Sequence, residues 1–248
     1  MNTENQFQIK SVIVIPTYNE TDSLVHFLHK LLPLCSITVA IIICDDSNSS
    51  VRSFVKNLVN KLGGQFKNVI IHDFVQYKGG RGSAVIRGFR KALDFFPNAE
   101  HFIECDADDS HQVEDILKII NEPRKLDFII GSRYLLNSKI EGWPISRRVF
   151  SKMLNLVIPR VLAIKTTDAT NGLRRYSRNA VQEILKTPLK TRGFITLSEI
   201  ALKLRDSGIH PTEVSTTFVN RKIGESTVTL REIMNSAFGL ITLIIGKK

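Results

Sequence analysis

The sequence predicts an α/β protein with a mostly parallel sheet and helices on both faces. Short apolar runs alternate with helical segments through the first half of the chain, and their continuous β-branched character is typical of strands buried on both faces of a parallel sheet. In addition, three of the runs are each followed at once by polar or acidic residues. These three runs are Val12–Ile15, Val39–Cys44 and Phe102–Cys105.

The elements of the first half follow from local signals. Thr21 and Asp22 offer an N-cap to a helix that stops at Pro33. Gly63 and Gly64 are expected to close a second helix. The predicted order is a strand at 12–15, a helix at 24–32, a strand at 39–44, a helix at 51–62, a strand at 68–72, a helix opened by residues 78–82 and running to 96, a strand at 102–105, a helix at 113–120 and a strand at 126–130. This alternation predicts a doubly wound sheet.

The second half is less regular. A long helix is predicted over residues 145–164, with apolar residues on one side and arginines and lysines interleaved. Shorter helices are expected at 177–185 and 196–204, and a strand at 212–219. A last helix over 230–245 has one apolar stripe and is closed by Gly246 and two lysines. The stripe consists of Leu230, Ile233, Met234, Ala237, Phe238, Ile241 and Ile245. We therefore divide the chain into an α/β domain at 1–228 and an amphipathic segment at 229–248, which is either core or a membrane-surface helix.

Composition fits a soluble globular protein. The chain has 248 residues, of which 43% are hydrophobic and 8% aromatic, enough for a large core without staples. The three cysteines lie in or beside apolar runs, so we expect buried, reduced thiols. Met1–Lys10 shows no signal-peptide pattern, and no apolar stretch reaches the ~20 residues of a membrane span.

The charge is unevenly distributed. Residues 1–124 hold 13 Lys and Arg against 15 Asp and Glu, whereas residues 125–248 hold 21 against 9. A solvated basic surface explains this, but such asymmetry more often indicates a polyanionic partner. Nucleic acid, an anionic membrane and a phosphorylated substrate all satisfy the charge alone.

The polar clusters predict a ligand site at one edge of the sheet. Parallel strands bring their carboxyl ends together, and ligands of open α/β sheets bind there. Asp106 and Asp108 lie on one side of an extended segment, about 7 Å apart, which suits a divalent cation that also binds diphosphate oxygens. Asp45 and Asp46 repel each other unless the site supplies donors, as a base or ribose would. His111 is expected to be a solvent-facing loop residue rather than a ligand.

The Gly79-Gly80-Arg81-Gly82 run begins a helix. It is either a tight turn or a contact to the diphosphate through backbone N–H groups and Arg81. The run lacks the GxxxxGK[ST] pattern of a P-loop, and a dinucleotide GxGxxG fingerprint would follow the first strand instead.

Together these motifs resemble the inverting family 2 glycosyltransferases with the GT-A fold. Within that family the chain is most similar to the dolichol-phosphate mannose synthase branch, over about residues 11–230. The resemblance rests on residues 12–20, 44–47, 78–84, 106–108 and 131–134 for the family, and on residues 147–151, 168–174 and 218–226 for the branch.

The resemblance implies three groups of site residues. The nucleotide would be held by Pro16, Tyr18, Glu20, Asp45 and Asp46, with Arg81 beside the diphosphate. Asp106 and Asp108 would bind Mg²⁺ or Mn²⁺ and the donor diphosphate, with Arg221 neutralising the leaving group. The phosphates of donor and acceptor would be bound by Arg133, Arg147, Ser151 and Arg221.

The chain also departs from the branch. Thr227 stands where a lysine commonly follows Gly-Glu-Ser, and the loop at 45–50 lacks the usual glycine pattern, so the donor remains open between GDP and UDP types. Members that use a hydroxyl acceptor often have a Glu-Asp pair where this chain has Ser198 and Glu199. A phosphate monoester needs no such base, because it is mostly dianionic at pH 7.

We therefore predict a metal-dependent hexosyltransferase that moves mannose or glucose from a nucleotide sugar to a polyprenyl or dolichyl phosphate. A family 2 enzyme acting on a sugar hydroxyl in surface polysaccharide assembly is the alternative, and a sugar nucleotidyltransferase is a more distant one. Nucleic acid is not expected as a partner. The helix at 230–245 either packs as core or lies on an anionic membrane, which would place the protein peripherally on its cytoplasmic face.

Overall fold

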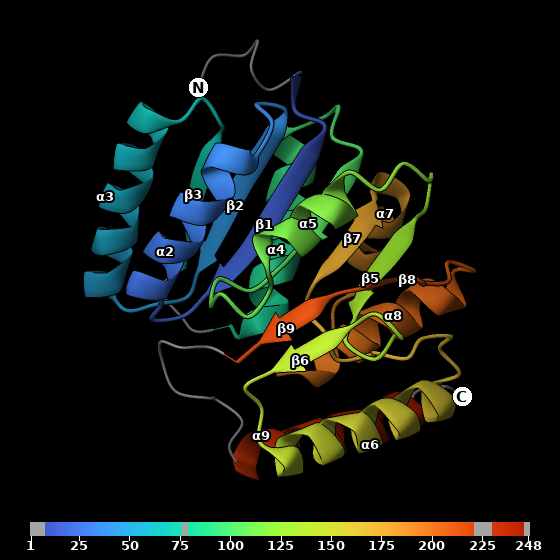
Figure 1. The fold of residues 1–248 in the computed structure, drawn as a ribbon. Helices are drawn as coiled ribbons and strands as arrows, with labels where there is room; N and C mark the ends of the chain where they lie inside the picture. The colour runs from blue at the N-terminus through green and yellow to red at the C-terminus, as the bar shows by residue number, and fades with distance from the viewer. Residues whose placement is uncertain (1–7, 76–78, 221–229, 246–248) are drawn as a thin grey trace.

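A computed structural model describes residues 8–75, 79–220 and 230–245, and the side chains of the last segment from Ser236 onward. Its elements run in an α/β order (Figure 1). They are β1 Ser11–Thr17, α2 Asp22–Leu31, the 3₁₀ turn η1 Leu32–Leu34, β2 Val39–Asp45, α3 Ser49–Gln65, β3 Ile70–Phe74, α4 Arg81–Phe95, β4 His101–Glu104, α5 Val113–Ile120, β5 Phe128–Ser132, β6 Lys139–Glu141, α6 Ile145–Leu162, β7 Arg174–Ser177, α7 Arg178–Leu185, α8 Ile195–Asp206, β8 Thr212–Ser215, β9 Thr217–Val219 and α9 Leu230–Ile245.

A seven-stranded sheet with the order β3-β2-β1-β4-β7-β5-β8 forms the centre of the molecule. Every neighbouring pair is parallel except the two pairs that β7 makes, with β4 and with β5. The prediction of a mostly parallel sheet flanked by helices is therefore confirmed. A second, two-stranded sheet pairs β6 with β9.

Apolar side chains fill both sides of the main sheet. All seven residues of β2 are buried, as the continuous apolar run predicts for a strand covered on both faces. Helices α2, α3 and α5 cover one face, and α4, α7 and α8 cover the other. Figure 1 shows the first group in front of the sheet and α4 and α7 behind it.

Several predicted boundaries were wrong. Gly63 and Gly64 lie inside α3, which continues to Gln65. Neither glycine has a positive φ, so neither ends the helix in a left-handed conformation. Thr21 precedes α2 but its side chain makes no capping hydrogen bond. The strand expected at 212–219 is split into β8 and β9, which belong to different sheets. Strands β6 and β7 were not predicted.

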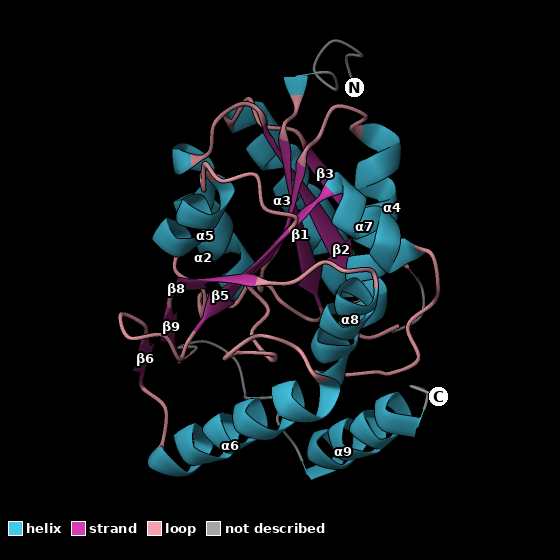
Figure 2. Ribbon diagram, turned by 90° about the vertical axis from the view of Figure 1, so that its right-hand side faces the viewer, coloured by secondary structure: helices cyan, strands magenta, loops and turns pink. Residues whose placement is uncertain are grey.

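Helices α6 and α9 lie side by side at the foot of the molecule, away from the main sheet (Figures 1 and 2). Of the stripe predicted on α9, the described members Ala237, Phe238, Ile241 and Ile245 are exposed. The interpretation of these four as core is therefore wrong. Leu243, outside the stripe, is buried, and among the α9 side chains described, 236–245, the others are exposed or partly exposed. No helix in the described part of the chain is both long and apolar enough to cross a bilayer.

Candidate active site

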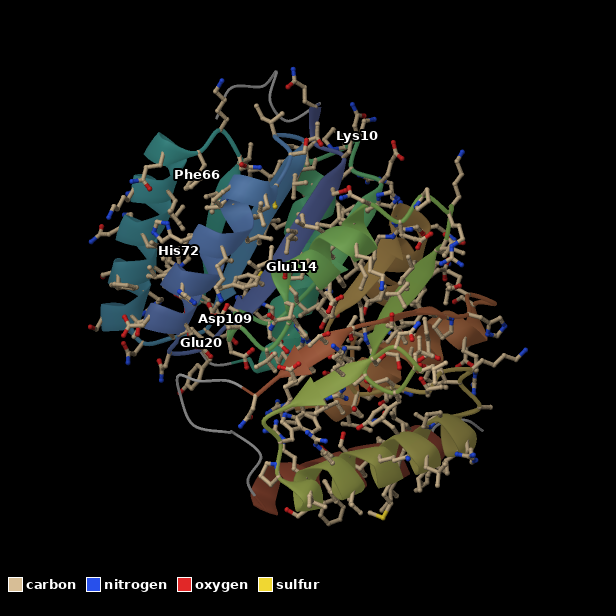
Figure 3. The ribbon with its side chains drawn as sticks, in the orientation of Figure 1. Lys10, Glu20, Phe66, His72, Asp109 and Glu114 are labelled. Atoms are coloured by element: carbon tan, nitrogen blue, oxygen red, sulfur yellow. The ribbon has the colours of Figure 1, made fainter. Side chains whose placement is uncertain are left out.

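Strand register brings the three predicted clusters to one edge of the sheet. Thr17 at the end of β1 pairs with Asp45 at the end of β2, and Val14 of β1 pairs with Glu104 at the end of β4. Because the chain winds outward from β1 in both directions, the gap between β1 and β4 is the topological switch point of the sheet, the place where such folds bind ligands. In Figure 3, the labelled Glu20 and Asp109 lie at this carboxyl edge, and Lys10 marks the opposite edge.

Asp45 is fully buried at the end of β2. Its carboxylate accepts a hydrogen bond from the N–H of Ser47 (2.9 Å) and lies 3.0 Å from Nε2 of His72. Burial opposes ionisation, but the hydrogen bonds from His72 and Ser47 hold the pKa of Asp45 below its ordinary value. Ser47 in turn accepts from the N–H of Asn19 (2.7 Å), so Asp45 ties the loops after β1 and β2 together.

Asp46 holds the glycine turn before α4. Its Oδ2 accepts from the N–H groups of Gly79 (2.9 Å) and Gly80 (3.2 Å), and its Oδ1 accepts from Arg87 (3.0 Å). Gly80 has a φ of 83°, which a glycine adopts without strain. The two N–H groups predicted to face a diphosphate therefore donate to Asp46, which favours the tight-turn alternative for this run.

Arg81 forms an internal ion cluster with two carboxylates at the end of β4. Its Nε donates to Asp106 (3.0 Å), its Nη1 donates to the fully buried Glu104, and Tyr176 donates to the other oxygen of Glu104 (2.9 Å). Burial disfavours the charged guanidinium, but Asp106 and Glu104 outweigh it and raise the pKa of Arg81. Arg81 thus provides a permanent positive charge next to Asp106.

The Asp-x-Asp segment turns sharply after β4. Asp108 accepts from both the N–H (3.1 Å) and the Oγ (2.5 Å) of Ser110. The next residue, Asp109, has a left-handed φ of 58° and pairs with His26 (3.2 Å) and Lys30 (3.4 Å) of α2. The turn is therefore anchored to α2 through Asp109.

His111 is buried, with 2% of its surface exposed, so its prediction as a solvent-facing loop residue was wrong. The backbone N–H of Asp106 donates to Nδ1 of His111 (3.2 Å), and Nε2 lies 2.9 Å from Oδ1 of Asn171. Because Nδ1 accepts, Nε2 carries the proton and donates to Asn171, which in turn donates to the carbonyl of Gly131. This chain of contacts links the segment before β7 to Asp106.

Arg133, just after β5, is buried in a bidentate pair with Asp168. Its Nε and Nη2 donate to the two carboxylate oxygens at 2.7 and 2.8 Å, and Nη2 also donates to Thr170 (2.7 Å). Asp168 is fully buried. Burial opposes its ionisation, but Arg133 outweighs burial and holds the pKa of Asp168 below its usual value.

Aromatic rings surround the predicted acceptor residues. The guanidinium of Arg147 lies 4.2 Å from the ring centre of Trp143, and that of Arg133 lies 5.4 Å from the same ring. Arg147 also donates to Asn220 (3.0 Å). Ser151, one turn further along α6, accepts from the hydroxyl of Tyr134 (2.7 Å). Arg133, Arg147 and Ser151 therefore line one aromatic wall.

The donor set at Asp106 and Asp108 suits a hard divalent cation. Carboxylate oxygens are the ligands that Mg²⁺ and Mn²⁺ prefer, and a third of the Asp106 side chain is exposed (32%). Gly172 keeps the space beside it open, since a Cβ there would lie 3.0 Å from Oδ2 of Asp106 and collide with Arg81. Among the described residues, no three His, Cys, Asp or Glu side chains form a ready-made metal site, so a bound cation would need further oxygens from a diphosphate and water.

Of the four remaining predicted site residues, the structure describes Pro16, Tyr18 and Glu20. Pro16 is in β1, and Tyr18 follows that strand with 45% of its surface exposed. Glu20 accepts from the hydroxyl of Ser23 in α2. Arg221 lies outside the described residues.

Sequence reasoning gave no role to Glu104, Asp168, Asn171 or Gly172. Glu104 had a local signal, since a glutamate inside an apolar strand needs a partner. The other three belong to the 168–174 motif already noted.

Comparison with known proteins agrees with this geometry. The model for "Glycosyl transferase family 2" matches residues 12–185. The chain belongs to this family. It is 29% identical to an undecaprenyl-phosphate mannosyltransferase of Micrococcus luteus, over 88% of this chain and 87% of that protein. It is 26% identical to a polyprenol monophosphomannose synthase of Mycolicibacterium smegmatis, over 92% and 84%.

Solved structures of glycosyltransferases share the fold. A mannosyltransferase of Pyrobaculum calidifontis, solved with GDP-Man and Mn²⁺, superposes with a TM-score of 0.62 at 14% identity over 98% of this family 2 chain. The chain spans 65% of that longer protein. A glucosyl-3-phosphoglycerate synthase of Mycobacterium tuberculosis, solved with Mn²⁺ and UDP, gives a TM-score of 0.62 over 96% of this chain and 80% of its own.

Proposed function

We propose that this glycosyltransferase transfers mannose from a nucleotide sugar to a polyprenyl phosphate. The two relatives that align over most of the chain are named an undecaprenyl-phosphate mannosyltransferase and a polyprenol monophosphomannose synthase. The basic second half and the arginines along the aromatic wall fit an anionic acceptor better than a neutral sugar.

The hydrogen bonds of Glu199 are the observation that favours a phosphate acceptor over a hydroxyl acceptor. This carboxylate is buried and accepts from the N–H groups of Lys190 (2.6 Å) and Thr191 (2.8 Å) and from the hydroxyl of Thr191 (2.6 Å). Both of its oxygens are therefore engaged in holding the loop before α8. A hydroxyl acceptor would need a general base, whereas a phosphate monoester is already mostly dianionic at pH 7.

On the donor side, we assign the nucleoside to the carboxyl edge of the sheet beside Pro16, Tyr18, Glu20 and the Asp45–Asp46 pair. The exposed ring of Tyr18 offers a stacking face for a base. Because Asp45 and Asp46 hold the surrounding loops, they shape this edge as much as they contact the nucleoside. Arg81 is proposed to act through Asp106: it donates a hydrogen bond to the Asp106 carboxylate and so fixes the group that would face the diphosphate.

Asp106 and Asp108 would hold Mg²⁺ or Mn²⁺, which would stabilise the negative charge that develops on the leaving nucleoside diphosphate. Arg221, in the family's Val-Asn-Arg-Lys segment, is proposed to add a second positive charge there. His111 fixes the backbone of Asp106 through the contact described above.

On the acceptor side, Arg147, Ser151 and Arg133 are proposed to bind the lipid phosphate. The indole N–H of Trp143 is buried, and the described part of the chain offers it no hydrogen-bond acceptor. A buried donor without a partner costs free energy, and a phosphate oxygen at this wall would satisfy it. Arg133 already pairs with Asp168, so it mainly positions the wall, and Arg147 is the principal contact.

The reaction inverts the sugar in a single displacement. An oxygen of the acceptor phosphate forms a bond to C1 of the sugar while the bond from C1 to the nucleoside diphosphate breaks. The diphosphate leaves with the electron pair, and no proton needs to be removed from the acceptor. The protein's part is to align the two phosphates and neutralise the charge between them.

The proposal is tested first by ligand binding. A thermal-shift panel of GDP, UDP, GDP-mannose and UDP-glucose with Mn²⁺ identifies the donor, because ligands that bind the native state raise its apparent stability. Transfer of labelled mannose to a short-chain polyprenyl phosphate in detergent then tests the acceptor. Transfer to a free sugar or glycan instead, with no product on the lipid phosphate, would establish the hydroxyl alternative.

A further inference from the structure

Glu104, the last residue of β4, is a carboxylate inside the core. It is fully buried, and so are the two residues before it, Phe102 and Ile103. A buried charge costs free energy unless it is paired and hydrogen-bonded. Both oxygens of Glu104 are engaged, because Arg81 donates to Oε1 and the hydroxyl of Tyr176 donates to Oε2 (2.9 Å). An apolar residue would fill this strand position at lower cost, so the carboxylate indicates that a charge is needed here.

Tyr176 of β7 fixes Glu104 from the side of the sheet. Its ring stacks on Phe128 of β5, with the ring centres 5.1 Å apart, and meets Phe89 of α4 edge-on at 5.3 Å. Burial, together with the charge of Glu104, raises the pKa of Tyr176. The phenol therefore keeps its proton and is the donor to Oε2, while Oε1 accepts from Arg81.

Arg81 bridges Glu104 and Asp106. It is the first residue of α4, where the positive end of the helix dipole disfavours a cation. While Nη1 donates to Glu104, Nε donates to Oδ1 of Asp106 (3.0 Å) and Nη2 lies 2.9 Å from the same oxygen. Only 17% of the Arg81 side chain is exposed, so salt and water screen these charges little. The guanidinium is therefore held in place by both carboxylates.

The charge of Arg81 opposes the binding of a cation at Asp106. A divalent ion bound there would be repelled by the guanidinium, which also competes for the same carboxylate. Glu104 changes this balance, because the bridged group then contains two negative charges and one positive charge. One negative charge remains for the cation. Without Glu104, Arg81 would neutralise Asp106, and the cation would meet an ion pair instead of an anion.

We propose that Glu104 is a positioning residue of the metal site, which holds Arg81 in place and offsets its charge so that Asp106 can bind a divalent cation. Tyr176 orients Glu104 for this task. Groups that contact metal ligands in this way commonly change metal affinity by ~10–100-fold when they are replaced. The inference rests on the metal-binding role that the proposed function gives to Asp106.

The test is a titration of the whole protein with Mn²⁺, in which electron paramagnetic resonance measures the free ion. Glu104→Gln keeps the shape of the side chain and removes its charge, and it should weaken Mn²⁺ binding by about tenfold or more. The variant is expected to fold, because Arg81 keeps Asp106 as its partner and no buried charge is left alone. The thermal shifts caused by GDP and UDP should be unchanged in EDTA, and high Mn²⁺ should restore their metal-dependent part.

A double variant tests whether charge is the cause. Glu104→Gln with Arg81→Gln removes one charge of each sign and leaves the negative charge of Asp106, so it should bind Mn²⁺ more tightly than Glu104→Gln alone. The matched control is Glu199→Gln, which replaces another buried glutamate whose two oxygens both accept hydrogen bonds. This control should bind Mn²⁺ as wild type does.

Wild-type Mn²⁺ affinity in Glu104→Gln, or no Mn²⁺ binding by wild type, would overturn the proposal. So would an equal loss in Glu199→Gln, or a double variant that binds no better than Glu104→Gln alone. Because the titration needs no sugar transfer, it separates this proposal from the proposed function. The expected Mn²⁺ affinities without any mannose transfer to the lipid phosphate would support the positioning role and refute the proposed function, and transfer with unchanged Mn²⁺ affinity in Glu104→Gln would do the reverse.

Discussion

Replacing Asp168 by asparagine tests the buried ion pair with Arg133 at the aromatic wall. Asp168→Asn keeps the shape of the side chain but removes the charge opposite Arg133, which is 8% exposed. Two of the bonds that Arg133 donates to this carboxylate, at 2.7 and 2.8 Å, then meet one carbonyl oxygen and one NH₂ group. Leaving a buried charge without its partner costs ~3–5 kcal/mol, a large share of a typical total stability of ~5–15 kcal/mol.

The assay is urea unfolding followed by tryptophan fluorescence. Trp143 is the single tryptophan of the chain, and the Arg133 guanidinium lies 5.4 Å from its ring, so the signal reports the site itself. With an m-value of about 3 kcal/mol/M, the midpoint should fall by about 1–1.7 M. The pKa of Asp168 is lowered in the fold from an ordinary value of 3.8. The difference between wild type and variant should therefore be constant above about pH 4 and shrink as the pH falls through the folded-state pKa.

An exposed pair gives the matched control. Lys10 and Glu100 are 3.3 Å apart with more than half of each side chain exposed, so Glu100→Gln should cost less than ~1 kcal/mol. If Asp168→Asn cost no more than this control, the pair would not be acting as a desolvated one. Equal midpoints for wild type and Asp168→Asn at pH 7 would refute the reasoning outright.

Three further variants are predicted. Asp108→Asn should leave the fold intact and lower mannose transfer by far more than tenfold, and a variant that kept over a tenth of wild-type turnover, ~1.4 kcal/mol of barrier, would contradict the metal role. Gly172→Ala should weaken Mn²⁺-dependent nucleotide binding in the thermal-shift assay, because its Cβ would lie 3.0 Å from Oδ2 of Asp106; an unchanged shift would show that the segment moves aside. Gly63→Ala has open space in the interior of α3 and should raise the free energy of unfolding by ~0.5–1 kcal/mol, measured by urea unfolding, whereas a loss would show strain there.

The first half of the fold could be read from the sequence because its strands are continuous apolar runs. Strand β7 was not predicted, because its sequence is not an apolar run. Two of its three buried positions hold Arg174 and Arg175 rather than apolar residues, and both side chains donate hydrogen bonds to backbone carbonyls. Arg174 donates to the carbonyls of Ala169 and Leu197 (2.8 and 2.6 Å), and Arg175 to that of Glu122 (2.9 Å), among others. Leu197 and Glu122 lie 23 and 53 residues away along the chain, so these partners leave no periodic local signal.

In the candidate site, the positions of the carboxylates could be predicted from the sequence, but their contacts could not. Asp106, Asp108 and the Asp45–Asp46 pair were expected at one edge, because strand ends can be located from local pattern and parallel strands share their carboxyl edge. What each carboxylate touches depends on tertiary packing, as with Asp46 on the glycine turn. The burial of His111 also depends on tertiary packing. Its burial comes from the segment before β7, which no pattern around residue 111 announces.

The insertion of β7 between β4 and β5 also orders the assembly of the molecule. β5 precedes β7 in the chain, yet β4 and β5 are joined only through it. An antiparallel strand brings its beginning, rather than its end, to the edge where its parallel neighbours finish. A growing chain that has not yet reached residue 168 therefore has a sheet divided in two, and Arg133 at its edge lacks Asp168. The residues at the ends of β1, β2 and β4 can therefore come together before those around Arg133, which are complete only once β7 has closed the sheet.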